Sequence, residues 1–246
     1  MRVLLLKAWC FVPITDLACY TRRMSTMRFE AERSAVADYM RRLYDRGLTT
    51  ASGGNISLRL DKNHFLITPS ALDKGRLVAD QIAIVTLEGK SLTPHLRLSI
   101  ETEMHRLILI SRPDAMAVVH AHPTYASAFT ALSRDGGVAI DTHLIAESYY
   151  ILEDPIFVDY RLMGTVDLAE QVAMKAFDHD VLLLENHGVL TIGKSLLDAF
   201  DKIELLERAS QMTLYTRLME GAGCQLHPLE EGRLAQLMRM KYGPAR

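Results

Sequence analysis

Two histidines, His120 and His122, stand one residue apart at the end of an apolar stretch that reads MAVVHAHP. Side chains alternate between the two faces of a strand, so both imidazoles point to one face, about 6–7 Å apart along the chain. That spacing lets both rings reach one metal ion. The pattern is short, however, and on its own it is more typical of two histidines that serve packing or the surface.

A third histidine makes a metal site the better interpretation. His187 lies in the stretch LLLENHGVL, which predicts two buried strands joined by a tight turn. We expect Gly188 to be the residue that this turn requires. Three neutral imidazoles form a catalytic zinc-type site in which one coordination position stays open for water or substrate.

The stretch SIETEMH places two further titratable residues four positions apart. On a helix, Glu101 and His105 lie on the same face, whereas Glu103 falls off that face and is the more solvated acid. Taken alone, the pair is more typical of a surface carboxylate near a histidine than of a catalytic group.

Two loops offer groups that can bind an anion. The stretch SGGNIS can present backbone N–H groups and the Asn55 amide, and ITPS offers the hydroxyls of Thr68 and Ser70 beside a rigid proline. Each stretch is equally compatible with an ordinary turn.

The elements that must position these residues are hairpins with helices before, between and after them. Apolar periodicity predicts strands at 56–60, 64–70, 81–87, 115–122 and two within 181–193, and helices at 29–43, 99–111, 124–132, 166–177, 195–219 and in the C-terminal tail. Thr165 and Ser195 are candidate caps. This order favours an α/β fold with three α/β/α layers and a mixed, mostly antiparallel sheet.

Composition sets limits on the partners. The chain has 246 residues, 49% hydrophobic and 24% charged, with a formal net charge of −2. These values fit one globular domain and give no indication of a nucleic-acid or membrane partner. The three cysteines form no CxxC pair, which is typical of a reducing compartment, so we expect a cytoplasmic protein.

The first 26 residues differ in pattern from the rest of the chain. They are basic and apolar, but Lys7, Pro13 and Asp16 interrupt the apolar stretch. We expect residues 1–26 to be a leader of uncertain status, with Met24 or Met27 as an alternative start, and the domain to occupy residues 27–246.

Together, the stretches GGNIS, ITPS, SIETEMH, RPDAMAVVHAHP and LLLENHGVL resemble the class II aldolase/adducin head family. Its members include fuculose-phosphate aldolase, ribulose-phosphate 4-epimerase and related metal-dependent lyases. The resemblance runs from about Phe29 to the C-terminus. It implies a small-molecule substrate and a homotetramer whose active sites lie between neighbouring subunits.

The resemblance also implies roles for individual residues. The metal, zinc or alternatively manganese, would be held by His120, His122 and His187. Glu101 would be the acid/base, and Tyr242 in MKYG would be a proton donor for a neighbouring subunit. The remaining matches would hold the phosphate of the substrate: Gly54, Asn55, Ser70 and Ser99.

Two departures affect the implied phosphate site. Ala71 stands where the family usually has glycine, and Ile100 replaces a second serine, so the phosphate is in question while the metal chemistry is not. The function implied is a divalent-metal-dependent aldolase, a carbon–carbon lyase of carbohydrate metabolism that cleaves a short ketose phosphate of the fuculose 1-phosphate type through a metal-stabilised enediolate.

Three other functions stay open. Ile100 favours a decarboxylase of a hydroxylated carboxylic acid, aromatic acids included, because an apolar wall suits a ring. A sugar-phosphate epimerase or dehydratase would use the same residues. A structural, adducin-like head is disfavoured because such members lack the metal ligands, which this chain retains.

Overall fold

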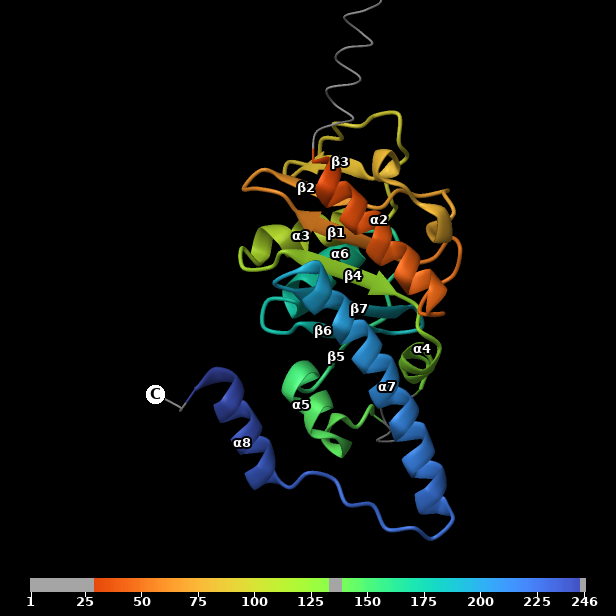
Figure 1. Ribbon diagram of the computed structural model, residues 1–246, viewed down its shortest axis with the longest axis vertical. Coiled ribbons are helices and arrows are strands. Elements are labelled where there is room, and N and C mark those ends of the chain that lie inside the picture. Colours follow the sequence, from red (N-terminus) through yellow and green to blue (C-terminus); the bar gives the residue numbers. More distant parts are fainter. Residues whose placement is uncertain (1–28, 133–138, 244–246) are drawn as a thin grey trace, which may run out of the picture.

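The computed structural model describes residues 29–132 and 139–243, so the expected leader at 1–26 lies outside the described residues. Its strands form one sheet in the order β3-β2-β1-β4-β7-β6-β5 (Figure 1). Neighbouring strands are antiparallel except β5 and β6, which confirms the mixed, mostly antiparallel sheet. The bounds are β1 Asn55–Arg59, β2 His64–Ile67, β3 Ala83–Thr86, β4 Ala117–Ala121, β5 Ile156–Val158, β6 Val181–Leu184 and β7 Gly188–Gly193.

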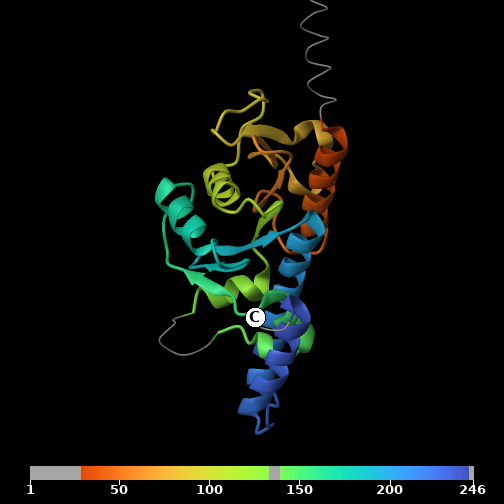
Figure 2. The same ribbon diagram turned by 90° about the vertical axis from the view of Figure 1, so that its left-hand side faces the viewer.

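Helices cover both faces of this sheet. On one face lie α2 (Glu30–Asp45) and α7 (Leu196–Gly221), and on the other lie α3 (Thr102–Ser111) and α6 (Val166–Lys175) (Figure 2). Each face has its own apolar core, so the three-layer α/β/α architecture is confirmed. The remaining helices are α4 Thr124–Thr130, α5 Ala146–Leu152, α8 Glu231–Tyr242 and the short turns η1 Lys74–Arg76, η2 Ala79–Gln81 and η4 Thr142–Leu144. No helix within the described ranges is both long and apolar enough to cross a membrane.

The alternation of side chains along the central strand β4 determines which helical layer His120 faces. Ala117, Val119 and Ala121 belong to the core on the α7 side, whereas Val118 belongs to the core on the α3 side. His120 therefore points toward α3, as the period of two requires. All five residues of β4 are buried, so the sheet fixes this histidine in place.

Two helix starts agree with the sequence. The Thr165 hydroxyl accepts a hydrogen bond from the Leu168 N–H, and the Ser195 hydroxyl accepts one from the Asp198 N–H. The segment with α5 and β5 was not predicted. Its strand β5 has only three residues and pairs with β6 in parallel. Such a strand is not flanked by the tight-turn residues that predict a hairpin.

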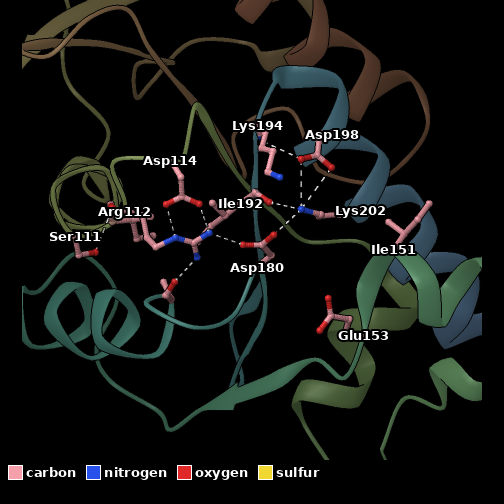
Figure 3. Close-up of polar contacts among 12 residues, drawn as sticks. Ser111, Arg112, Asp114, Ile151, Glu153, Asp180, Ile192, Lys194, Asp198 and Lys202 are labelled. Atoms are coloured by element: carbon pink, nitrogen blue, oxygen red, sulfur yellow. Dashed lines mark hydrogen bonds and ion pairs between the residues drawn. The ribbon is translucent and has the colours of Figure 1, made fainter. Parts of the chain in front are cut away.

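An ion-pair network lies at the end of the β6–β7 hairpin opposite to His187. Asp180, which precedes β6, lies between Arg112 and Lys202, at 3.0 Å and 2.8 Å (Figure 3). Burial alone would raise the pKa of Asp180, but Lys202 and Arg112 lower it below its usual value. Lys202 also donates to the Ile192 carbonyl. The network thus ties α7 and the end of α3 to the hairpin that carries His187.

Candidate metal centre

The structure brings the three predicted histidines together. His120 lies near the end of β4 and faces α3, His122 directly follows the strand, and His187 lies in the β6–β7 turn. One nitrogen from each ring lies within 4.8 Å of the other two. The Nε2 atoms of His120 and His122 are 3.1 Å apart. In a tetrahedral zinc site with Zn–N bonds of about 2.0–2.1 Å, two ligand nitrogens would be about 3.3 Å apart.

The hydrogen bonds and charges of these rings suit a cation. His120 Nδ1 donates to the Val189 carbonyl at 2.9 Å, which leaves a lone pair on its Nε2, facing His122. Burial lowers the pKa of His120, and it lowers the pKa of His122 to about 3. Neutral rings whose lone pairs converge repel one another unless a positive ion lies between them. The donor set therefore fits a divalent metal ion.

Glu101 supplies a carboxylate beside the histidines. It is the residue before α3 and only 7% exposed. Its Oε1 lies 3.0 Å from His187 Nε2, and its Oε2 lies 3.5 Å from His120 Nε2. Burial alone would raise the pKa of Glu101, but the adjacent histidines and the Asn55 amide lower it, so the carboxylate is ionised. Among the described residues, His187 Nδ1 is buried without a hydrogen-bond partner, and a bound ion or substrate would satisfy it.

The reason for Gly188 differs from the expected one. The left-handed turn conformation belongs to Asn186, with φ of 53°, and not to Gly188. A Cβ atom at Gly188 would lie 2.4 Å from His122 Cδ2 and 2.7 Å from the Ala121 carbonyl oxygen. The expectation that the turn requires this glycine is therefore wrong. Glycine is needed there because the hairpin passes directly over the His122 ring.

This close approach gives a prediction. In Gly188→Ala, the added methyl group must displace the His122 ring, and we expect affinity for zinc to fall about 10–100-fold, the range seen when ligand positioning is disturbed. Competition against a chromophoric chelator measures it. Gly221→Ala is the control, because a Cβ there meets nothing within 4 Å. Equal affinity in the two variants would show that the ring can move without losing the metal.

Of the four residues expected to hold a phosphate, Asn55 and Ser99 are in direct side-chain contact. Asn55 Nδ2 donates to Glu101 Oε2 at 2.6 Å and to Ser99 Oγ at 3.2 Å, so these side chains form one cluster. Gly54 has φ of 65°, and a Cβ atom at this position would lie only 2.6 Å from the His120 carbonyl oxygen. Ser70 lies on the neighbouring loop, where its N–H donates to the Arg97 carbonyl.

The loop after Ser70 carries strain. Ala71 has φ of 60°, the left-handed region in which a Cβ costs about 1–2 kcal/mol. This conformation explains why glycine is the usual residue in the family that the sequence resembles. The methyl group of Ala71 leaves the turn itself intact.

Three residues with buried polar side chains were not predicted. His105 is fully buried, so its interpretation as part of a surface pair is wrong, and Ser57 lies beside it. Ser57 could have been found because it follows Asn55 by two positions on the same strand face. Lys74 is also buried, and its N–H and Nζ donate to the Ala51 and Pro69 carbonyls, which join the two predicted anion loops.

Lys74 makes stability depend on pH. Burial lowers the pKa of its ammonium to about 8, whereas in the unfolded chain it stays near 10.5. The unfolded state then binds more protons between these values, so stability rises with pH in that window. Relative to Lys74→Met, we expect the parent protein to gain about 2 kcal/mol between pH 7 and 9.5. Urea unfolding at both pH values measures this, and parallel curves for parent and variant would contradict it.

Tyr242 lies away from the histidines within one chain. Its hydroxyl donates to the Glu153 carboxylate, and both residues line a cavity of about 590 Å³ whose walls include none of the three histidines. Partial burial of the hydroxyl and the Glu153 carboxylate raise the pKa of Tyr242, so the phenol stays protonated. The residue as a whole is 66% exposed. A role at the metal centre would therefore need the Tyr242 of another copy.

Comparison with known proteins places this arrangement in context. Residues 34–214 match the family model described as Class II Aldolase and Adducin N-terminal domain. This range contains the histidines and Glu101 but ends before α8 and Tyr242.

The alignments with three named relatives cover most of each relative's length. An L-fuculose phosphate aldolase of Methanococcus maripaludis is 35% identical over 69% of this chain and 89% of its own. A 3-oxo-tetronate 4-phosphate decarboxylase of Haemophilus influenzae is 32% identical over 74% and 86%. The crystal structure of L-fuculose-1-phosphate aldolase from Thermus thermophilus is 31% identical, with a TM-score of 0.68, over 80% of this chain and 100% of that one.

Proposed function

This chain belongs to the family of class II aldolases and adducin N-terminal domains, and we propose that it is a divalent-metal-dependent aldolase. Its proposed substrate is a short ketose phosphate of the fuculose 1-phosphate type. The observation that carries this proposal is the buried Glu101 carboxylate 3.0 Å from His187 within the histidine cluster. It places a proton-transfer group beside a site that fits a metal.

In this proposal each group has one task. His120, His122 and His187 would hold the cation, which would supply a Lewis acid for the negative charge that develops on the substrate oxygens. In the condensation direction, ionised Glu101 takes a proton from the carbon beside the ketone, and the resulting carbanion forms the new bond to the aldehyde carbon. The alkoxide that results takes a proton from Tyr242 of a neighbouring copy. Cleavage is the reverse of these steps.

Finer assignments accompany this function. Zinc is the proposed metal, since three imidazoles suit it, with manganese as the alternative. The proposed assembly is a homotetramer in the cytoplasm, with Tyr242 reaching a site on another subunit. The exposure of Tyr242 is compatible with such a contact. Light scattering of the purified protein measures the subunit number.

A decarboxylase is the second candidate. One relative at 32% identity is a 3-oxo-tetronate 4-phosphate decarboxylase. The side chain of Ile100 is 52% exposed beside Glu101 and packs over Gly164, which puts an apolar group at the rim of the site. The same metal centre could stabilise the carbanion left by carbon dioxide.

One screen separates the two candidates. The zinc-loaded protein is offered L-fuculose 1-phosphate, 5-deoxy-D-ribulose 1-phosphate and 3-oxo-tetronate 4-phosphate, and both aldehyde and carbon dioxide release are measured. Aldehyde without carbon dioxide supports the aldolase. Carbon dioxide alone supports the decarboxylase, and neither product from any substrate would end both proposals for these phosphates.

Ile100 gives a further prediction about the phosphate. Ile100→Ser restores a hydroxyl beside Ser99, so we expect the KM for a phosphorylated ketose to fall by about 5–10-fold, the value of one added hydrogen bond. Leu218→Ser is the control, because that exposed apolar residue lies near the C-terminal end of α7. An unchanged KM in Ile100→Ser would indicate that the natural substrate places no phosphate there.

A further inference from the structure

Buried hydrogen bonds run from β1 to Glu101 through a histidine that the proposed reaction does not use. The Ser57 hydroxyl oxygen lies 2.7 Å from His105 Nδ1, and His105 Nε2 lies 2.5 Å from Asn55 Oδ1. Asn55 Nδ2 lies 2.6 Å from Glu101 Oε2. Ser57 and His105 are fully buried and Asn55 is 3% exposed, so water cannot readily replace any member. A lost bond in this chain would leave a buried polar atom unpaired.

The donors and acceptors follow from the orientation of the Asn55 amide. Its NH₂ group donates to Glu101 Oε2 at 2.6 Å. The Asn55 oxygen then faces His105, and His105 Nε2 must carry a proton to donate to it. Burial lowers the pKa of His105 to about 3, so the ring is neutral and its Nδ1 can accept from the Ser57 hydroxyl. Each step fixes the next.

We propose that His105 is a positioning residue whose Nε2–H tautomer holds the Asn55 amide in the orientation that donates to Glu101. A half-turn of the amide would place the Asn55 oxygen against the carboxylate, with two acceptors in contact. Asn55 pairs directly with His120 across β1 and β4, so its amide is already fixed on the face of the histidine cluster. The mechanistic part of this inference rests on the proposed role of Glu101, while the hydrogen-bond order does not.

The hydrogen-bond order can be measured without substrate. In protein labelled with ¹⁵N-histidine, the signal missing from His105→Gln identifies His105. We expect Nε2 to be protonated and Nδ1 to be bare, with no change from pH 5.5 to 8.5. A ring that carries its proton on Nδ1, or that titrates in this range, overturns the proposal.

The Asn55 amide protons give a second measurement, in protein labelled uniformly with ¹⁵N. We expect their exchange with solvent to accelerate at least about 10-fold in His105→Met, which removes the donor to Asn55 Oδ1. His105→Gln should keep slow exchange, because its amide can donate from nearly the same place as Nε2. Equal exchange in parent and His105→Met would contradict the proposal, provided that both are folded.

Turnover tests the consequence for Glu101. With whichever of the three phosphates the parent protein converts, we expect His105→Met to lower kcat about 10–100-fold, the usual effect of an outer partner, with KM and zinc content little changed. His105→Gln should restore most of kcat. In an Asn55→Ala background, His105→Met should cost nothing further, because the two residues act in series. Additive losses in this cycle would mean that His105 acts otherwise than through Asn55.

A matched control separates this effect from the loss of any histidine. His64→Met removes an imidazole that contacts Asp61 at the start of β2, away from the metal centre, and should leave kcat unchanged. If the parent protein converts none of the phosphates, the proposed function fails, and the tautomer and exchange measurements still decide the order of the hydrogen bonds.

Discussion

The His187→Ala protein should lose its bound divalent ion and its turnover together. His187 supplies the only ligand of the proposed set that comes from the β6–β7 turn, and its removal leaves two nitrogens 3.1 Å apart on one side. We expect zinc affinity to fall by more than about 100-fold, since even an outer partner of a ligand is worth 10–100-fold. Metal content after dialysis and kcat with the converted phosphate provide the two measurements.

The matched control for this loss is His95→Ala, which removes an exposed histidine outside the cluster. It should retain both metal and turnover. A His187→Ala protein that keeps stoichiometric zinc would show that His187 is not a ligand, and the case for a three-histidine centre would then fail.

Glu101→Gln should separate the two properties that His187→Ala removes together. Glutamine keeps the shape of the side chain and an oxygen that can accept from the Asn55 amide, so the cluster should stay assembled. It cannot take a proton from carbon, and we expect kcat to fall by about 10²–10⁴-fold, the usual contribution of an acid/base group. Zinc content should match that of the parent protein.

Glu103→Gln provides the comparison on the same helix. Glu103 pairs with Arg106 at 2.5 Å and its side chain is 37% exposed, so its replacement should leave kcat near the parent value. Normal turnover in Glu101→Gln would assign proton transfer to another group, such as a residue of a neighbouring subunit. Loss of zinc in Glu101→Gln would instead make the carboxylate a ligand.

The sequence was sufficient to predict that the three histidines come together, because their geometry follows from local rules. His120 and His122 share a face by strand alternation, and the asparagine–histidine–glycine turn announces the hairpin that carries His187. The two apolar stretches around that turn were also predicted correctly as strands, β6 and β7. Local patterns could not show that Gly188 makes room for His122, because this contact joins strands distant in sequence.

The surroundings of the centre were harder to predict for the same reason. A helix pattern assigns His105 to a face, but only the sheet beneath that face shows whether the side chain is buried with Ser57 and Asn55. In the sequence, Lys74 resembles an ordinary charged loop residue. Only its contacts with both loops show that it is buried. The proposed role of Tyr242 depends on a neighbouring subunit, which a single sequence does not describe.

The side chains around the centre differ in how freely they can vary. The proposed ligands are held by buried β4 and by the hairpin whose strand β7 pairs with it, so a substitution there disturbs the core as well as the site. Ile100 instead lies half exposed in the turn before α3, with Gly164 as its near neighbour. Substitutions of Ile100 should therefore cost little stability, so this part of the surroundings can vary while the histidine cluster is kept.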